Sequence, residues 1–213
     1  MVFLSEDLWF PDPSEAETDG LLAVGGDLSP ERLMLAYRNG IFPWFIEYGE
    51  PYWFSPAERM VLYCDDVHTG RTLKKLVSSG KFNVTYDTAF KEVILSCAAV
   101  HKIKNGATWI SDEFVSAYVR LHHLGFAHSV EVWHDGELAG GIYGVTIGKI
   151  FCGESMFSIV GNASKIGLIH LCKSGKYYII DCQVSSAHLA AMGGKTIGRN
   201  SFIKLLHAEN SPG

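Results

Sequence analysis

The sequence of 213 residues predicts an α+β fold, because the spacing of its apolar residues changes from a helical period to an alternating one along the chain. Serine residues that can cap helices precede two of the helical patterns, at Ser29 and Ser111. The alternating period covers three successive segments, at residues 127–133, 138–147 and 150–156. Asp135 and Gly136 separate the first two of these segments and favour a tight hairpin turn. The sequence therefore predicts helices followed by an antiparallel three-stranded meander.

The N-terminal part of the chain is expected to form a small domain. A helix begins at Pro30, which suits the first helical position, and ends at Gly40. Residues 41–60 are rich in aromatic residues and proline, and regular elements rarely tolerate several prolines. We therefore expect an ordered but irregular segment there. The predicted boundary separates a small N-terminal domain, residues 1–62, from a larger domain, residues 63–213.

The larger domain is expected to surround its meander with helices. Thr69 can cap a helix that ends before Gly80, and Asp87 can cap a second helix, with an alternating strand at residues 82–86 between them. After the meander we expect a helix, a strand and two short helices, at residues 162–171, 177–183, 186–192 and 201–207.

Composition and charge exclude several classes of protein. The net charge of −5 argues against a protein that coats nucleic acid, because phosphate binding depends on Lys and Arg. No apolar run reaches the roughly 18 residues of a membrane span, and Glu6 and Asp7 stand where a signal peptide would be basic. The five cysteines form no CxxC pair, and the histidines and cysteines lack zinc-ligand spacing. We therefore expect reduced thiols, no metal and a cytoplasmic location.

Three polar residues stand at the ends of apolar strands: Glu154, Asp181 and Gln183. Burying an unpaired polar group costs roughly 2–7 kcal/mol, so such residues are uncommon without a partner or a role. Alternation puts Glu154 on one face of its strand with Cys152 and Met156, and puts Asp181 on one face with Gln183. If the two strands are neighbours, the three polar side chains converge. The alternative is that the two acids cap loops or pair with a lysine, but three such residues together favour a functional site.

Five sequence motifs together resemble one enzyme family. They are LLAVGGDLSP at residues 21–30, GIFPW at 40–44, GESMFS at 153–158, NASK at 162–165 and IDCQ at 180–183. Over residues 10–202 the chain is similar to the leucyl/phenylalanyl-tRNA–protein transferases. The resemblance implies the fold of acyl-CoA N-acyltransferases. It also implies transfer of Leu, Phe or Met from aminoacyl-tRNA to the N-terminal Arg or Lys of a protein, which tags that protein for N-degron-dependent degradation.

The same resemblance implies the requirements of the reaction and the roles of the polar residues. Because the ester of aminoacyl-tRNA is already activated, no ATP and no cofactor are expected, and the enzyme is expected to be a monomer without a membrane partner. Family members relay a proton through the residues that match Asp181 and Gln183. A neutral amide has almost no basicity, so we expect Gln183 to orient the acceptor amine and Asp181 to supply negative charge behind it. That charge, together with Glu154, suits a cationic Arg or Lys side chain.

Substrate-binding residues are also implied by the resemblance. Trp44 and Trp109 match family residues at the aminoacyl-adenosine pocket, where an aromatic plane can stack on adenine. The alternative for each tryptophan is core packing. The expected lining of the pocket for the Leu or Phe side chain is Ile142, Met156, Phe157 and Ile180.

A run of basic residues is the candidate docking surface for tRNA. Its members are His68, Arg71, Lys74, Lys75 and Lys81. A solvated helix face is the commoner explanation of such a run, and the family resemblance favours tRNA.

Two other functions stay open on the sequence. An acyl-CoA-dependent N-acetyltransferase would carry Arg or Gln at the start of its pyrophosphate loop, and residues 158–163 (SIVGNA) lack it. A non-catalytic RNA- or peptide-binding module on the same fold would not need Glu154, Asp181 and Gln183 together.

Overall fold

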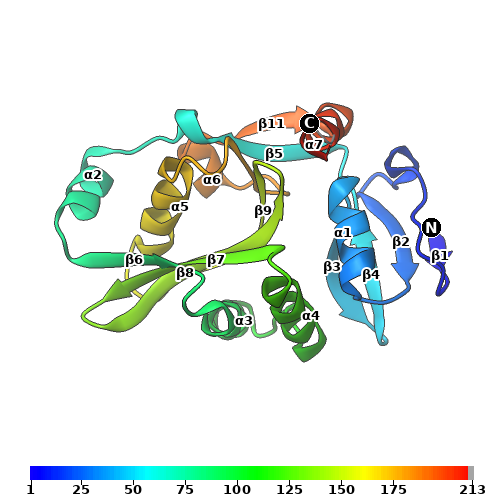
Figure 1. The fold of residues 1–213 in the computed structure, drawn as a ribbon, viewed down its shortest axis with the longest axis horizontal. Coiled ribbons are helices and arrows are strands. Elements are labelled where there is room, and N and C mark those ends of the chain that lie inside the picture. The colour runs from blue at the N-terminus through cyan, green and yellow to red at the C-terminus, as the bar shows by residue number, and fades with distance from the viewer. Residues whose placement is uncertain (211–213) are drawn as a thin grey trace.

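The protein folds around two β-sheets, which the computed structural model describes over residues 1–210 (Figure 1). The small sheet has the strand order β1 (Val2–Leu4), β2 (Leu21–Gly25), β4 (Glu50–Phe54) and β3 (Phe42–Glu47). The large sheet has the order β11 (Lys195–Gly198), β5 (Glu58–Tyr63), β10 (Ile179–Asp181), β9 (Ile150–Ser158), β8 (Glu137–Ile147), β7 (Ala127–His134) and β6 (Phe82–Tyr86). Two short 3-10 helices are η1 (Pro13–Glu15) and η2 (Cys64–Asp66).

Helices cover both faces of the large sheet (Figure 1). One face carries α3 (Phe90–Asn105) and α4 (Asp112–His123), and the other carries α2 (Arg71–Ser78) and α5 (Ala163–Lys173). α6 (Ala187–Ala191) precedes β11, and α7 (Arg199–Asn210) follows it. α1 (Pro30–Arg38) contacts β3 as well as α4 and α7, so this helix joins the small sheet to the large one.

Several local predictions are confirmed. Ser29 and Ser111 cap α1 and α4, and each side chain accepts a backbone N–H of the first turn. β7, β8 and β9 form the predicted antiparallel meander. Asp135 and Gly136 have φ of 52° and 82°, as a type I′ hairpin turn requires. The α+β class predicted from the sequence is therefore confirmed.

The irregular segment predicted for residues 41–60 is wrong, because this stretch forms β3, β4 and the first half of β5. The prolines occupy tolerated positions: Pro43 lies on the edge strand β3, and Pro51 lies beyond the part of β4 that pairs with β2. β5 pairs with β10 and β11, so the chain passes to the large sheet between Phe54 and Glu58. The division into domains at residue 62 stays a prediction.

Other boundaries also differ from the prediction. β1, β2 and β11 were not predicted, and the strand expected at residues 177–183 is only three residues long, Ile179–Asp181. α2 has Gly70 rather than Thr69 as its N-cap, and α3 begins after Ala89 rather than Asp87. Asp87 instead accepts the backbone N–H of Ser129 at 2.8 Å, which ties the end of β6 to β7.

A β-bulge at Glu154 overturns the predicted arrangement of side chains on β9. Tyr143 pairs with Ser155 and Gly144 pairs with Gly153, so Glu154 is an extra residue with no partner on β8. The bulge reverses the alternation, because Cys152 packs in the core under α3 and Met156 packs in the core under α5. The prediction that Cys152, Glu154 and Met156 share one face is therefore wrong.

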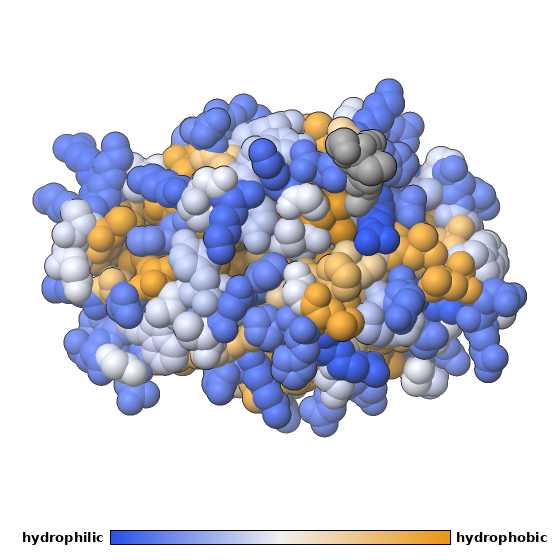
Figure 2. Space-filling view, in the orientation of Figure 1, coloured by the Kyte–Doolittle hydropathy of each residue, from blue (hydrophilic) through white to orange (hydrophobic). Residues whose placement is uncertain are grey.

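β9 and β10 create an opening in the large sheet. These strands are parallel and pair only over residues 150–152 and 179–181, so β9 continues to Ser158 without this partner. Within residues 1–210, each helix is too short or too polar to cross a lipid bilayer. Figure 2 shows hydrophilic side chains over most of one face, with hydrophobic side chains exposed between them in separate areas.

Candidate active site

The carboxylate of Glu154 lies at the opening between β9 and β10. Only 8% of the residue is exposed. Its Oε2 accepts a hydrogen bond from the hydroxyl of Tyr118 at 2.9 Å, and its Oε1 accepts one from Nε2 of Gln183 at 2.7 Å. Tyr118 comes from α4, and Gln183 follows β10, so three separate parts of the chain meet at this carboxylate.

A second phenol continues the hydrogen bonds away from Glu154. The hydroxyl of Tyr37, on α1, lies 2.5 Å from that of Tyr118. Burial raises the pKa of Glu154 to about 7, although hydrogen bonds from the two tyrosines oppose the rise. Near neutral pH both the protonated and the ionised forms of Glu154 are therefore populated, as a group that takes and returns a proton requires.

Asp181 forms a buried ion pair with Arg59 of β5. Nε and Nη2 of Arg59 donate to the two carboxylate oxygens at 2.8 and 2.7 Å, and both residues are at most 2% exposed. The guanidinium lies between the rings of Phe42 and Phe202, at 4.6 and 4.8 Å from their centroids. Burial lowers the pKa of Arg59, but the carboxylate of Asp181 outweighs that effect and raises it. The charge of Asp181 is therefore neutralised within the protein.

The ion pair also holds the backbone of Gln183. Gln183 has φ of 59°, in the left-handed region that a residue with a long side chain rarely adopts. Its N–H donates to Oδ1 of Asp181 at 2.9 Å, and its carbonyl accepts the N–H of Met60 at 3.2 Å. These contacts fix the unusual conformation that directs the Gln183 amide to Glu154.

An apolar hollow opens on one side of Glu154. It has a volume of about 230 Å³. Its lining includes Ile142, Met156, Leu168, Ile180 and Leu189, with Ser186 and His188 also present. Pockets for drug-sized ligands span roughly 300–1,000 Å³, so this hollow suits a single large apolar side chain.

An aromatic hollow of about 150 Å³ opens on the other side of Glu154. Trp44, Trp109 and His101 line it together with Gln183. The two hollows share Glu154 and Cys182 in their linings, so they meet beside the carboxylate of Glu154. Both tryptophans are half-buried, and Trp44 also packs its ring against Phe54 at 4.9 Å. Each tryptophan therefore contributes to packing and still presents a surface to the hollow.

The structure brings most of the predicted site residues together. Glu154 lines both hollows. Gln183, Trp44 and Trp109 line the aromatic hollow, and the apolar hollow is lined by Asp181, Ile142, Met156 and Ile180. Phe157 lies apart from them, because it follows Met156 on β9 and so points to the opposite face, where it is 2% exposed under α3.

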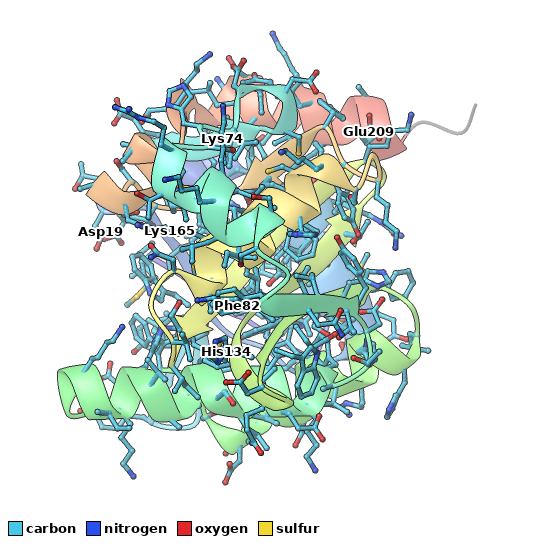
Figure 3. The ribbon with its side chains drawn as sticks, turned by 90° about the vertical axis from the view of Figure 1, so that its left-hand side faces the viewer. Asp19, Lys74, Phe82, His134, Lys165 and Glu209 are labelled. Atoms are coloured by element: carbon cyan, nitrogen blue, oxygen red, sulfur yellow. The ribbon has the colours of Figure 1, made fainter. Side chains whose placement is uncertain are left out.

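α2, which carries Arg71, Lys74 and Lys75 of the predicted basic residues, lies at the end of the molecule farthest from the small sheet (Figure 1). α2 turns Leu73, Leu76 and Val77 toward the core, and its basic side chains toward solvent. The exposed members are His68, Arg71, Lys74, Lys75 and Lys81. Lys165, which was not predicted, lies on α5, the helix that contacts α2 (Figure 3).

The sequence did not identify Arg59, Tyr37, Tyr118 or Leu168 as parts of the site. Arg59 directly precedes the apolar run at residues 60–62, and a charge next to a buried strand is a usable signal. The tyrosines belong to the apolar stripes of α1 and α4 and are typical of core residues, so no pattern distinguished them.

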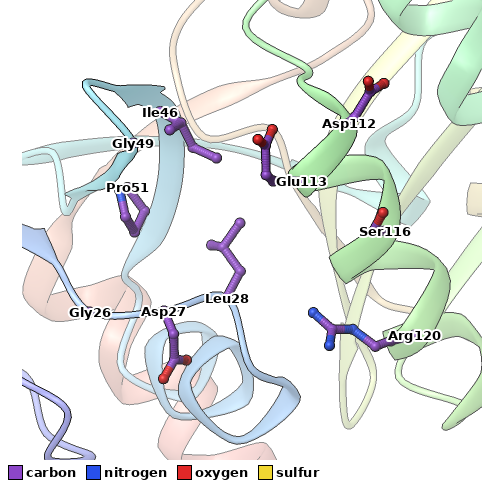
Figure 4. Close-up of a pocket in the computed structure, with 10 residues that line it drawn as sticks. All are labelled: Gly26, Asp27, Leu28, Ile46, Gly49, Pro51, Asp112, Glu113, Ser116 and Arg120. Carbon is purple, nitrogen blue, oxygen red and sulfur yellow. The ribbon is translucent and has the colours of Figure 1, made fainter.

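A larger cleft lies between the small sheet and α4 (Figure 4). Its volume is about 440 Å³. Asp27, Asp112, Glu113 and Arg120 contribute charged groups, and Ile46 lies on the opposite wall from α4. In the described part of the chain, none of the predicted site residues lines this cleft. The convergence of polar groups, rather than size, therefore locates the candidate site.

Other features of the described chain bear on ligands. Within residues 1–210, no group of three or more His, Cys, Asp and Glu side chains could hold a metal ion. All five cysteines are free thiols.

The strand order, with parallel strands β9 and β10 that diverge beside Glu154, places the chain in the N-acyltransferase fold class. The solved structure of FemX has the same fold, with a TM-score of 0.51 at 10% identity over 83% of this chain and 70% of FemX. The family model for leucyl/phenylalanyl-tRNA protein transferase matches residues 61–207, and the model for the N-terminal domain of that family matches residues 26–57. The chain belongs to the leucyl/phenylalanyl-tRNA–protein transferase family.

Similarity to curated relatives extends over nearly the whole chain. The leucyl/phenylalanyl-tRNA–protein transferase of Syntrophobacter fumaroxidans is 51% identical over 212 residues, covering 98% of this chain and 90% of the relative. That of Flavobacterium johnsoniae is 48% identical over 213 residues, covering 98% of this chain and all of the relative. The family predicted from the sequence motifs is therefore confirmed, whereas the acetyltransferase and the non-catalytic module are not supported.

Proposed function

We propose that this protein transfers leucine or phenylalanine from aminoacyl-tRNA to the N-terminal Arg or Lys of acceptor proteins. The family supports the reaction. The observation that carries it for this chain is the meeting of an apolar hollow and an aromatic hollow at Glu154 and Cys182. One activated ester with an apolar side chain on one side and an adenosine on the other matches that arrangement. Methionine transfer and the tagging of acceptors for N-degron-dependent degradation belong to the same proposal.

The donor occupies both hollows in this proposal. The Leu or Phe side chain enters the apolar hollow, where Leu168 and Ile180 contact it. The terminal adenine stacks in the aromatic hollow on Trp44 and Trp109, and stacking on an aromatic side chain contributes about 1–3 kcal/mol per base. This pose holds the ester carbonyl beside Glu154 and Gln183, and holding the reactants in place supplies much of the catalysis.

The chemical step is attack of the acceptor amine on the ester carbonyl. The amine has a reference pKa of about 7.7–8.0, so part of it is neutral at physiological pH. Its nitrogen forms a bond to the carbonyl carbon, the bond from that carbon to the ribose oxygen breaks, and the amine proton moves to the leaving oxygen. We assign the transfer of that proton to Glu154, which receives it from nitrogen and returns it to oxygen.

Gln183 and Asp181 support this step in different ways. A carboxylate only accepts hydrogen bonds, so the amide nitrogen of Gln183 faces Glu154 and the amide oxygen is turned away from it, as an acceptor for the incoming amine. Asp181 acts through Gln183, since both of its oxygens are engaged by Arg59 and one also by the Gln183 N–H. The negative charge that attracts a cationic acceptor side chain is then that of ionised Glu154, rather than that of Asp181.

The body of the tRNA docks on α2 in this proposal. Lysine and arginine contacts to phosphates carry no base information, so one basic face serves tRNAs of different sequence. The exposed set is His68, Arg71, Lys74, Lys75 and Lys81. The proposal also includes a monomer in the cytoplasm; for the location, the five free thiols are typical of a reducing compartment.

One assay tests the proposed function. The protein is incubated with radiolabelled leucyl-tRNA and with peptides that begin with Arg or with Glu. Label should pass to the Arg-initiated peptide and not to the Glu-initiated one. Absence of transfer under conditions in which a curated relative is active would refute the proposal, and calorimetric binding of coenzyme A would favour the acetyltransferase instead.

A further inference from the structure

We propose that Tyr118 and Tyr37 are positioning residues for Glu154, and that they stabilise its ionised form for proton transfer. This inference rests on the proposed function of Glu154. The two phenols form one line of hydrogen bonds that begins on α1 and reaches the carboxylate. They therefore connect the helix beside the small sheet to the reacting centre in the large one.

The direction of each hydrogen bond follows from the chemistry of the carboxylate. Ionised Glu154 can only accept, so Tyr118 donates its proton to Oε2 at 2.9 Å. Tyr118 has no second proton to donate, so at its 2.5 Å contact with Tyr37 it accepts. Tyr37 is then the donor, and both phenols are polarised toward the same negative charge. A charge-assisted chain of this kind is stronger than two separate neutral hydrogen bonds.

Burial makes these contacts decisive for the charge state of Glu154. Tyr37 and Tyr118 are at most 1% exposed, so water does not replace a lost hydroxyl. The other ionisable groups near the carboxylate come from four strands and from the linings of the two hollows. The strands carry Arg59, Tyr143, Cys152 and Asp181, and the linings add Cys182, His101 and His188. Burial lowers the pKa of the two histidines and raises that of the Cys182 thiol, so it favours the neutral form of all three. Arg59 is occupied by Asp181, and the buried phenol and thiol have pKa values raised by burial, so they stay neutral. The stabilising donors are therefore the two tyrosines and Gln183.

Tyr143 provides a matched control. It is fully buried in the same core and packs its ring against that of Tyr118, with 5.6 Å between centroids. Its hydroxyl has no hydrogen-bond partner in the described part of the chain. Removing that hydroxyl tests the packing of this core without removing a donor from Glu154.

The test compares Tyr118→Phe, Tyr37→Phe and Tyr143→Phe in two measurements. The first is the pH dependence of kcat/KM for transfer to one Arg-initiated peptide, whose own titration is common to all variants. The second is the infrared C=O band of protonated Glu154, identified by its absence in Glu154→Gln and followed against pH. Loss of a donor to the ionised form raises the pKa of Glu154, so Tyr118→Phe should move both titrations alkaline by about one pH unit. Tyr37→Phe should move them in the same direction, and Tyr143→Phe should leave them in place.

The outcomes separate this inference from the proposed function. An active Tyr118→Phe enzyme whose titrations match wild type would overturn the inference and leave the transferase reaction intact. An equal shift in Tyr143→Phe would also overturn it, because packing would then explain the effect. If Tyr118→Phe does not fold, Tyr37→Phe decides in the same way. Wild-type protein without transfer would instead refute the proposed function.

Discussion

The ion pair between Arg59 and Asp181 should stabilise the fold and the site together, and Arg59→Met measures both effects. Methionine keeps an apolar chain between Phe42 and Phe202 and removes the charge. Asp181 then loses both guanidinium hydrogen bonds, although it keeps the N–H of Gln183, in a site that is 0% exposed. Breaking a buried pair by removing one partner costs about 3–5 kcal/mol. For a chain of this size that loss corresponds to a fall in Tm of roughly 6–20 °C.

A double-mutant cycle with Asp181→Asn separates the pair from its surroundings. Asparagine keeps an oxygen for the Gln183 N–H, so the double variant leaves no charge buried without a partner. Urea unfolding should find the double variant more stable than the sum of the single variants predicts, by about 2–3 kcal/mol. Losses that add within about 0.5 kcal/mol would refute the reasoning. Both single variants should also lower kcat for transfer, because the side chain at position 181 then loses the ion pair that holds it against the N–H of Gln183.

The apolar hollow, the Asp87–His128 pair and α2 each give a further prediction. Leu168→Phe reduces the hollow, so kcat/KM should fall about tenfold more for phenylalanyl-tRNA than for leucyl-tRNA, and equal losses would contradict this. The hydrogen bond that His128 donates to Asp87 raises the pKa of His128, and the hydrogen bonds that Asp87 accepts from His128 and Ser129 lower the pKa of Asp87 despite its burial. Stability from the histidine is present below about pH 6.5 and lost as pH rises through its folded pKa, and that from the aspartate is present above about pH 4. Urea unfolding of His128→Gln should therefore show a loss of less than about 1 kcal/mol between these values, because both groups are partly exposed, and the loss should vanish in alkali. The last variant replaces three basic residues of α2 by alanine, Arg71, Lys74 and Lys75. The slope of log affinity for tRNA against log salt concentration should become shallower by about two to three units, and transfer from an aminoacyl-adenosine donor should be unchanged.

Local signals in the sequence predicted much of the fold. Ser29, Ser111 and the Asp135-Gly136 turn each act within a few residues, so their effects are visible in the sequence. The segment at 41–60 was misjudged because the tolerance of Pro43 depends on β3 being an edge strand, which is a property of the assembled sheet.

The site shows the same division between local and non-local information. Glu154, Asp181 and Gln183 were predicted to converge, and they do so around one opening in the sheet. Arg59, however, is 122 positions from Asp181 in the chain, and no spacing rule joins the two. The bulge at Glu154 also has no sequence signal of its own. The sheet faces on which Met156 and Phe157 lie therefore depend on how β9 pairs with β8, which the alternation of residues along the sequence does not predict.

The most direct test of the central claim is the single-turnover rate of leucine transfer by Glu154→Gln, measured beside Glu131→Gln. Glu131 is a matched control, because it is also a fully buried carboxylate held by hydroxyl groups, those of Ser129, Thr85 and Thr88. If Glu154 moves the proton at the meeting point of the two hollows, Glu154→Gln should lower the rate by about 10²–10⁴-fold, and Glu131→Gln should stay near wild type. A Glu154→Gln rate close to that of wild type, or an equal loss in both folded variants, would contradict the account.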